Sequence, residues 1–124
     1  MAIAIGTDIV EIARIADTVS RQGLKFVQRI LSANELEQYR AKSNSNAFLA
    51  KRFAAKEAIA KALGTGIGRG VSFQDIEVTN NSNGAPQVKL TGGAEKALAE
   101  LGATKVLLSL SDEKEYALAF AVLV

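Results

Sequence analysis

The chain has 124 residues, of which 48% are hydrophobic and 23% charged, so it can bury one hydrophobic core and we expect a single domain over residues 1–124. It contains no cysteine and no histidine, which excludes disulfides, thiol nucleophiles, histidine general bases and Cys/His zinc sites. Any bound metal must have oxygen ligands, as Mg²⁺, Ca²⁺ and Mn²⁺ do, and the net charge of +2 predicts no general affinity for nucleic acid.

The N-terminal segment alternates small and branched residues over residues 2–7, which predicts a buried strand with Asp8 just past its end. It lacks the basic start and the cleavage site of a signal peptide, and no apolar run is long enough to span a membrane. We therefore expect a cytoplasmic protein with no membrane partner. Asp8 has two interpretations, the N-cap of the helix that follows and a carboxylate ligand of Mg²⁺.

Residues 11–30 have a helical period, and Gly23 divides them into two shorter predicted helices. Apolar residues fall on one side of this segment: Ile15, Val19, Phe26 and Ile30. Four cations form a basic stripe on another side: Arg14, Arg21, Lys25 and Arg29. A stripe of this kind is a solvated face on most helices, and its alternative interpretation is a docking surface for an acidic partner.

The rest of the chain predicts alternating helices and strands. Ser32 and Glu35 have the spacing of a capping box, which predicts a helix to about residue 42, and Asn46 is expected to cap a longer helix that ends at Gly64. Strands are predicted at residues 73–79, 87–90, 106–111 and 116–124, the first two joined by an Asn-Gly turn, with a short helix at 94–101. This order predicts an α+β fold, an antiparallel sheet with packed helices.

The helix before Gly64 is the strongest candidate for a site. Three charges, Lys56, Glu57 and Lys61, stand among small alanines, and Glu57 and Lys61 share a face because they are four residues apart. An ordinary ion pair on a solvated face is the plain alternative. The glycine-rich loop that follows lacks the Gly-Lys-Ser/Thr ending of a P-loop, so by itself it indicates a helix end. Together, these groups are the kind that bind a phosphorylated ligand through a hard cation.

Two motifs resemble those of the holo-acyl-carrier-protein synthases, which are small 4′-phosphopantetheinyl transferases. Residues 6–12 (GTDIVEI) resemble the N-terminal motif of that family, and residues 52–66 (RFAAKEAIAKALGTG) match its longer second motif at essentially every fixed position. The resemblance covers almost the whole chain. It implies a phosphopantetheinyl-transferase-like fold and the transfer of 4′-phosphopantetheine from coenzyme A to a serine of apo-acyl carrier protein, with release of adenosine 3′,5′-bisphosphate, in support of fatty-acid biosynthesis.

The resemblance also implies roles for single residues. Asp8 and Glu57 would bind Mg²⁺, and Lys61 would help to hold a phosphate of coenzyme A, so these three form the expected catalytic set. Further residues would lie along the cofactor: Arg52, Lys56, Gly64, Thr65 and Gly66. Acyl carrier protein is acidic, so it is the natural partner of the basic stripe, and family members of this size form homotrimers with active sites between subunits.

Two points stay open at this level. The base that takes the serine proton is either Glu57 itself or a water molecule on the cation. Many relatives carry a His-x-Ser-x-Ser/Thr-His pattern late in the chain, where this sequence has Leu107 and Asp112 in place of the histidines, with Ser109 left as a possible donor to the cofactor. We expect Asp112 to lie outside the cofactor pocket because it would repel phosphate. The alternative function is a module that binds coenzyme A or acyl carrier protein without turnover.

Overall fold

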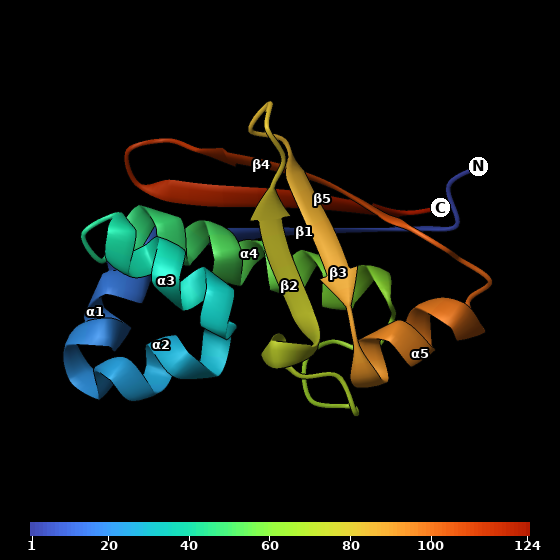
Figure 1. Ribbon diagram of the computed structural model, residues 1–124, viewed down its shortest axis with the longest axis horizontal. Coiled ribbons are helices and arrows are strands. Elements are labelled where there is room, and N and C mark those ends of the chain that lie inside the picture. Colours follow the sequence, from blue (N-terminus) through green and yellow to red (C-terminus); the bar gives the residue numbers. More distant parts are fainter.

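The computed structural model describes residues 1–124 and confirms the α+β class, with helices packed against antiparallel strands (Figure 1). The elements follow in the order β1 (Ala4–Glu11), α1 (Ile12–Gln22), α2 (Leu24–Ile30), α3 (Ala33–Ala41), α4 (Asn46–Ala62), the 3₁₀ turn η1 (Phe73–Asp75), β2 (Ile76–Asn80), β3 (Pro86–Leu90), α5 (Gly92–Glu100), β4 (Val106–Asp112) and β5 (Tyr116–Leu123). No helix is both long enough and apolar enough to cross a membrane.

The main sheet has the strand order β1-β5-β4, and β2 and β3 form a separate hairpin. Strand β5 shows why one face of the sheet packs closely on α4. Its inward residues Ala117, Ala119 and Ala121 are completely buried, whereas Leu118 and Phe120 on the outer face are 40% and 42% exposed. Alanines allow helix and sheet backbones to approach, so the core of the molecule forms between this face and α4.

Helix α4 is the central element. It packs along β1 and β5 of the main sheet, with α1 to α3 gathered around its N-terminal half (Figure 1). Its alanines at 50, 54, 55, 58 and 60 are completely buried. Such a helix has no broad solvated face, and four of its charged residues have specific partners: Lys51, Arg52, Lys56 and Lys61.

Several local expectations are confirmed, and others need correction. Gly23 ends α1 with a φ of 65°, and Ser32 and Glu35 form the expected capping box at the start of α3. The cap of α4 is Ser45, whose side chain accepts from the Phe48 amide, so the prediction of Asn46 is wrong by one position. The strand predicted from residue 73 begins only at Ile76, because η1 occupies its first residues.

Candidate active site

Strand β1 and helix α4 touch through their backbones at Gly6. A Cβ atom on Gly6 would lie 2.0 Å from the carbonyl oxygen of Ala58 and 2.7 Å from the amide nitrogen of Ala62. Only glycine leaves room for this contact. Since side chains alternate along a strand, the residue two positions later, Asp8, also faces α4, and the contact brings it to the face that carries Glu57 and Lys61.

Asp8 pairs with Lys61 across 53 positions of sequence. The Lys61 ammonium donates to Oδ1 of Asp8 at 2.9 Å and to the Thr7 carbonyl at 3.0 Å. The side chain of Asp8 is 15% exposed, whereas that of Lys61 is 51% exposed. Asp8 therefore lies inside β1, and Glu11 is the N-cap of α1, so the N-cap interpretation of Asp8 is wrong. The plain Glu57–Lys61 ion pair is absent as well, because Lys61 turns toward β1.

Glu57 completes this cluster from the same helix. Burial raises the pKa of its carboxyl, the nearby charge of Asp8 raises it further, and Lys61 partly offsets both effects. No side chain or amide donates a hydrogen bond to the Glu57 carboxylate. It borders a cavity of about 320 Å³ that is otherwise mostly apolar, lined by Phe26, Arg29, Ile30, Phe53, Ile67 and Phe73.

The two carboxylates fit a hard cation such as Mg²⁺. They are close enough for Asp8 to affect the proton affinity of Glu57, and both offer oxygen atoms without a protein donor, since only Oδ1 of Asp8 is bonded. No group of three acidic side chains converges anywhere in the structure. Mg²⁺ commonly takes one or two protein carboxylates and completes its shell with water and phosphate oxygens, so two are sufficient.

Lys56, next to Glu57 in sequence, is a core residue. Its side chain is completely buried, and its ammonium donates to Oε1 of Glu35 at 2.6 Å, to the Ile30 carbonyl at 2.7 Å and to the Phe73 carbonyl at 3.2 Å. Burial lowers the pKa of Lys56, and Glu35 opposes that shift. All three donors are used, so the expectation of direct contact with the cofactor is wrong for this residue.

Arg52 is also buried, but it borders a second cavity. One guanidinium nitrogen of Arg52 donates to Oδ1 of Asn80 at 2.9 Å, and its Cζ atom lies 4.6 Å from the centroid of the Phe48 ring. The Nε atom of Arg52 has no hydrogen-bond partner. Burial lowers the pKa of Arg52. The cavity holds about 430 Å³ and is lined by Lys42, Phe48, Lys51, Arg52, Asn80, Gly84, Pro86 and Leu110. Three cations at one cavity make an electropositive pocket suited to an anion.

Asp112 is paired at the edge of this second cavity. Its Oδ1 lies 3.2 Å from the ammonium of Lys51. Asp112 is not among the residues that line this cavity. The expectation that it lies outside the cofactor pocket stays a prediction. Asp112 nevertheless neutralises part of the positive charge at the cavity.

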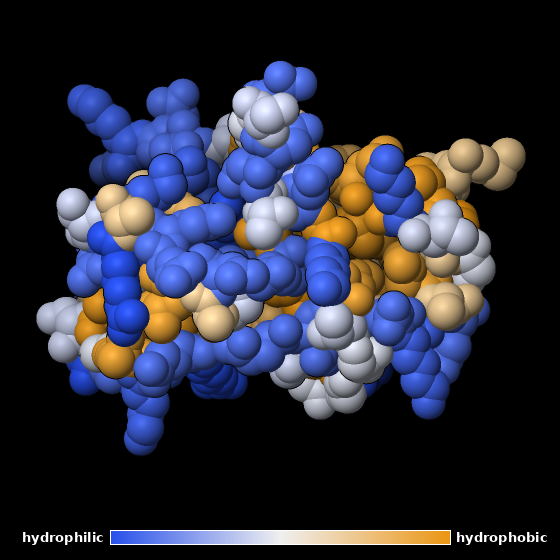
Figure 2. Space-filling view, in the orientation of Figure 1, coloured by the Kyte–Doolittle hydropathy of each residue, from blue (hydrophilic) through white to orange (hydrophobic).

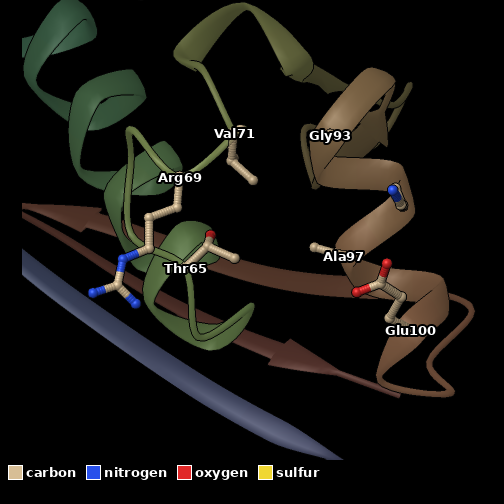
Figure 3. A pocket seen from close by; sticks show the side chains of 8 residues that line it. Thr65, Arg69, Val71, Gly93, Ala97 and Glu100 are labelled. Atoms are coloured by element: carbon tan, nitrogen blue, oxygen red, sulfur yellow. The ribbon is translucent and has the colours of Figure 1, made fainter.

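The glycine loop ends α4. The expectation that Gly64, Thr65 and Gly66 lie along the cofactor stays a prediction. The amides of Thr65 and Gly66 both donate to the Ala60 carbonyl, and the amide of Gly64 donates to the backbone carbonyl of Lys61. Gly64 and Gly66 have φ values of 79° and 63°, as expected after a helix end. Thr65 borders a shallow polar cavity of about 380 Å³ toward α5, where Arg69 extends away from the helix (Figure 3).

Ser109 and the basic stripe lie on different surfaces. Ser109 is exposed on the outer face of the sheet opposite Phe120, so it cannot reach the Asp8–Glu57–Lys61 cluster of its own chain. The stripe residues Arg14, Arg21, Lys25 and Arg29 are all exposed on α1 and α2. Arg21 is held by Asp17 at 3.1 Å on the same helix. Arg29 also lines the cavity beside Glu57, so the stripe reaches the cluster.

Sequence reasoning missed Glu35, Lys42, Lys51 and the apolar cavity. The sequence predicts only a capping role for Glu35, and nothing local shows that its carboxylate also binds Lys56. Lys42 and Lys51 look like ordinary helix lysines. The aromatic residues at 26, 53 and 73 were visible as apolar positions, but their convergence depends on three separate elements.

Comparisons with known proteins show which family the chain resembles over nearly its whole length. The sequence profile described as the 4′-phosphopantetheinyl transferase superfamily matches residues 4–121. A holo-[acyl-carrier-protein] synthase of Shewanella denitrificans is 56% identical over 121 residues, which cover 98% of this chain and 96% of the relative. The crystal structure of the Neisseria meningitidis holo-[acyl-carrier-protein] synthase has a TM-score of 0.91 and 43% identity, covering 100% of this chain and 99% of that one. The Helicobacter pylori holo-[acyl-carrier-protein] synthase in complex with coenzyme A has a TM-score of 0.86 and 34% identity, covering 97% and 99%.

Proposed function

This chain belongs to the 4′-phosphopantetheinyl transferase superfamily, within it to the holo-[acyl-carrier-protein] synthases, and on that premise we propose that Asp8, Glu57 and Lys61 form its active centre. The transfer joins the acceptor serine of apo-acyl carrier protein to the phosphopantetheine phosphorus of coenzyme A. Adenosine 3′,5′-bisphosphate leaves, and the modified carrier serves fatty-acid biosynthesis. The observation that carries the proposal is the meeting of these three side chains across the Gly6 contact.

Asp8 and Glu57 would hold Mg²⁺, which supplies charge neutralisation at the pyrophosphate of coenzyme A when bound. Lys61 has a different task. Its side chain is half exposed, so its ammonium can contact a phosphate oxygen while it stays beside Asp8. A cation at this place stabilises negative charge on the phosphate that leaves.

The serine hydroxyl must lose its proton as it attacks. Glu57 suits this task because burial and Asp8 raise its pKa, which makes its carboxylate more basic than an ordinary one. It borders a cavity whose other lining residues are mostly apolar. We propose that Glu57 receives the proton directly or orients a water molecule that does.

The carrier protein would dock along α1 and α2. The basic stripe supplies charge complementary to an acidic helical protein, and Arg29 lies at the point where the stripe meets the cavity beside Glu57. A carrier bound to the stripe would therefore bring its serine to the active centre.

We propose a homotrimer with active sites between subunits, as the family resemblance implies. The outer face of the sheet offers the surface, because Ile5, Ile9 and Phe120 are 62%, 61% and 42% exposed and no element of the chain covers them. Apolar surface is also visible between β3 and the chain termini (Figure 2). An exposed apolar sheet of this kind marks an interface.

The electropositive cavity of Arg52 shares no residue with the cavity beside Glu57. In the assembly, the Arg52 cavity of one subunit would lie beside the Asp8–Glu57–Lys61 cluster of its neighbour. Arg52, Lys42 and Lys51 would then bind the phosphate groups of coenzyme A, with Ser109 as a further donor near the interface. Binding of coenzyme A by the Helicobacter pylori relative supports this assignment of the ligand.

The test is the intact mass of apo-acyl carrier protein after incubation with this protein, coenzyme A and Mg²⁺. We expect a gain of one phosphopantetheine group. No gain with Mg²⁺ or Mn²⁺, in a sample that binds coenzyme A, would contradict transfer and favour a binding module.

A further inference from the structure

The ion pair between Lys56 and Glu35 joins five separate segments in the core. The Lys56 ammonium donates three hydrogen bonds. The acceptors are the Ile30 carbonyl at the end of α2, the Phe73 carbonyl at η1 and the carboxylate of Glu35. The Glu35 carboxylate also accepts from the Ser32 amide at 2.8 Å and from the Val78 amide at 2.8 Å. The start of α3 and strand β2 are thereby attached to α4 at the same point.

Stability alone is a poor explanation for this pair. Both side chains are completely buried, and the cost of removing two charges from water commonly equals or exceeds their attraction. Apolar residues of similar volume would fill the same space without that cost. What the charged pair provides, and apolar residues would not, is a fixed distance between α4 and the backbone carbonyls it binds.

Those carbonyls belong to the walls of the cavity beside Glu57. Ile30 and Phe73, whose carbonyls bind Lys56, both line that cavity. The carbonyl of Ile30 is among the last of α2, which have no partner within the helix and attract a cation. Lys56 therefore holds two walls of the cavity against α4, one residue before Glu57.

A second side chain joins the same two walls from outside. Gln74 in η1 donates to the Gln28 carbonyl at 2.6 Å and to the Leu31 carbonyl at 2.7 Å, both at the end of α2. Gln74 is exposed, so this link to α2 is independent of the buried pair. A short helix of seven residues is thus tied to η1 twice, once from the core and once from the surface.

We propose that Lys56 and Gln74 are positioning residues that fix the shape of the cavity beside Glu57 for the acceptor segment of the carrier protein. The inference rests on the proposed function, because it takes the carrier to dock on α2 at this cavity. A cavity whose walls are already fixed binds its partner more tightly, because no entropy is lost in ordering the walls on binding. On the proposed function, coenzyme A binds at the Arg52 cavity and the Asp8–Glu57–Lys61 cluster. Neither Lys56 nor Gln74 lines that cavity or has a hydrogen bond to that cluster.

Two variants test the proposal by binding, without turnover. Glu35→Gln with Lys56→Met removes both buried charges at once, which avoids the isolated charge that a single change would leave. Gln74→Leu removes only the surface link. We expect this variant to fold, because Gln74 is exposed. The matched controls are Leu98→Ala, a core truncation on α5, and Gln87→Leu, an exposed glutamine on β3.

Calorimetry would measure the dissociation constants for apo-acyl carrier protein and for coenzyme A separately. We expect both test variants to bind the carrier about tenfold more weakly, with coenzyme A binding unchanged and the controls like wild type. Wild-type affinity for the carrier in Gln74→Leu would overturn the proposal, and so would equal losses for both ligands. If the double variant does not fold, Gln74→Leu decides alone. Failure of the wild-type protein to modify its carrier would refute the proposed function, whereas the variant-to-wild-type ratio reports on this inference.

Discussion

Gly6 of β1 and Ala58 of α4 are in backbone contact, so close that a Cβ on Gly6 would meet the Ala58 carbonyl oxygen at 2.0 Å. This contact decides where Asp8 lies relative to Glu57 and Lys61. The N-terminal motif therefore contains two linked requirements, a residue without a side chain and a carboxylate two positions later on the same face of the strand.

Gly6→Ala should separate β1 from α4. The added methyl group meets backbone atoms that cannot rotate away, so we expect a loss of about 3 kcal/mol or more in unfolding free energy. Transfer activity should fall in the fraction that stays folded, since Asp8 moves with the strand. Thermal unfolding and initial rates check this, with Gln87→Ala, at an exposed position on β3, as the control. Normal stability in Gly6→Ala would show that the backbones of β1 and α4 are not in close contact at Gly6.

Glu57→Gln should stabilise the metal-free protein at neutral pH. Burial and Asp8 raise the pKa of Glu57 above its ordinary value of 4.5, so the folded protein holds this proton more tightly than the unfolded chain does. Ionised Glu57 therefore costs stability above the raised pKa. This loss of stability shrinks as the pH falls through the raised pKa of Glu57. Below the pKa that Glu57 has in the unfolded chain, the loss is absent.

The measurement is the melting temperature of wild type and Glu57→Gln in a chelator, from pH 4 to pH 8. The variant should melt higher at pH 7 to 8, and the difference should vanish near pH 4. Mg²⁺ should raise the melting temperature of the wild type and leave the variant nearly unaffected. A variant less stable than wild type at pH 8 would contradict the assigned direction of the pKa shift.

The sequence predicts contacts between residues that are close together in the chain better than contacts between residues that are far apart. The Ser32–Glu35 capping box and the break at Gly23 follow from neighbours in sequence, and both are found as expected. Asp8 and Lys61 are 53 positions apart, and their direct pairing depends on how β1 crosses α4. The sequence does not reveal the buried position of Lys56 for the same reason, because its partner Glu35 precedes it by 21 residues.

Charge reversal at Arg14 and Arg21 should weaken binding of the carrier protein. Both side chains are exposed on the stripe, so their substitution removes attraction to an acidic partner without touching the core. We expect the KM for apo-acyl carrier protein to rise about tenfold and the KM for coenzyme A to stay near its wild-type value. Added salt should reduce the difference between variant and wild type.

Lys114→Glu is the matched control, since it reverses one exposed charge in the turn between β4 and β5. It should leave both KM values unchanged. Equal effects on carrier protein and coenzyme A in the stripe variants would show that the stripe is not the docking surface.

Phe120→Asp should prevent assembly. Phe120 lies on the uncovered outer face of the sheet, and a buried carboxylate there would cost several kcal/mol per interface. Light scattering after size exclusion should give the mass of three chains for wild type and of one chain for the variant. Leu101→Asp, an exposed apolar position beyond α5, should leave the mass of the assembly unchanged. A wild-type mass of one chain would refute the trimer.

The central claim is that Asp8 and Glu57 serve the chemistry itself and not only the binding of coenzyme A. The most direct measurement is the single-turnover rate at which apo-acyl carrier protein gains phosphopantetheine, followed by intact mass at saturating coenzyme A and Mg²⁺, for wild type and Glu57→Gln. We predict a rate lower by about 10²–10⁴-fold in the variant, with coenzyme A still bound. A rate within a few-fold of wild type would contradict the assignment of Glu57 to the active centre.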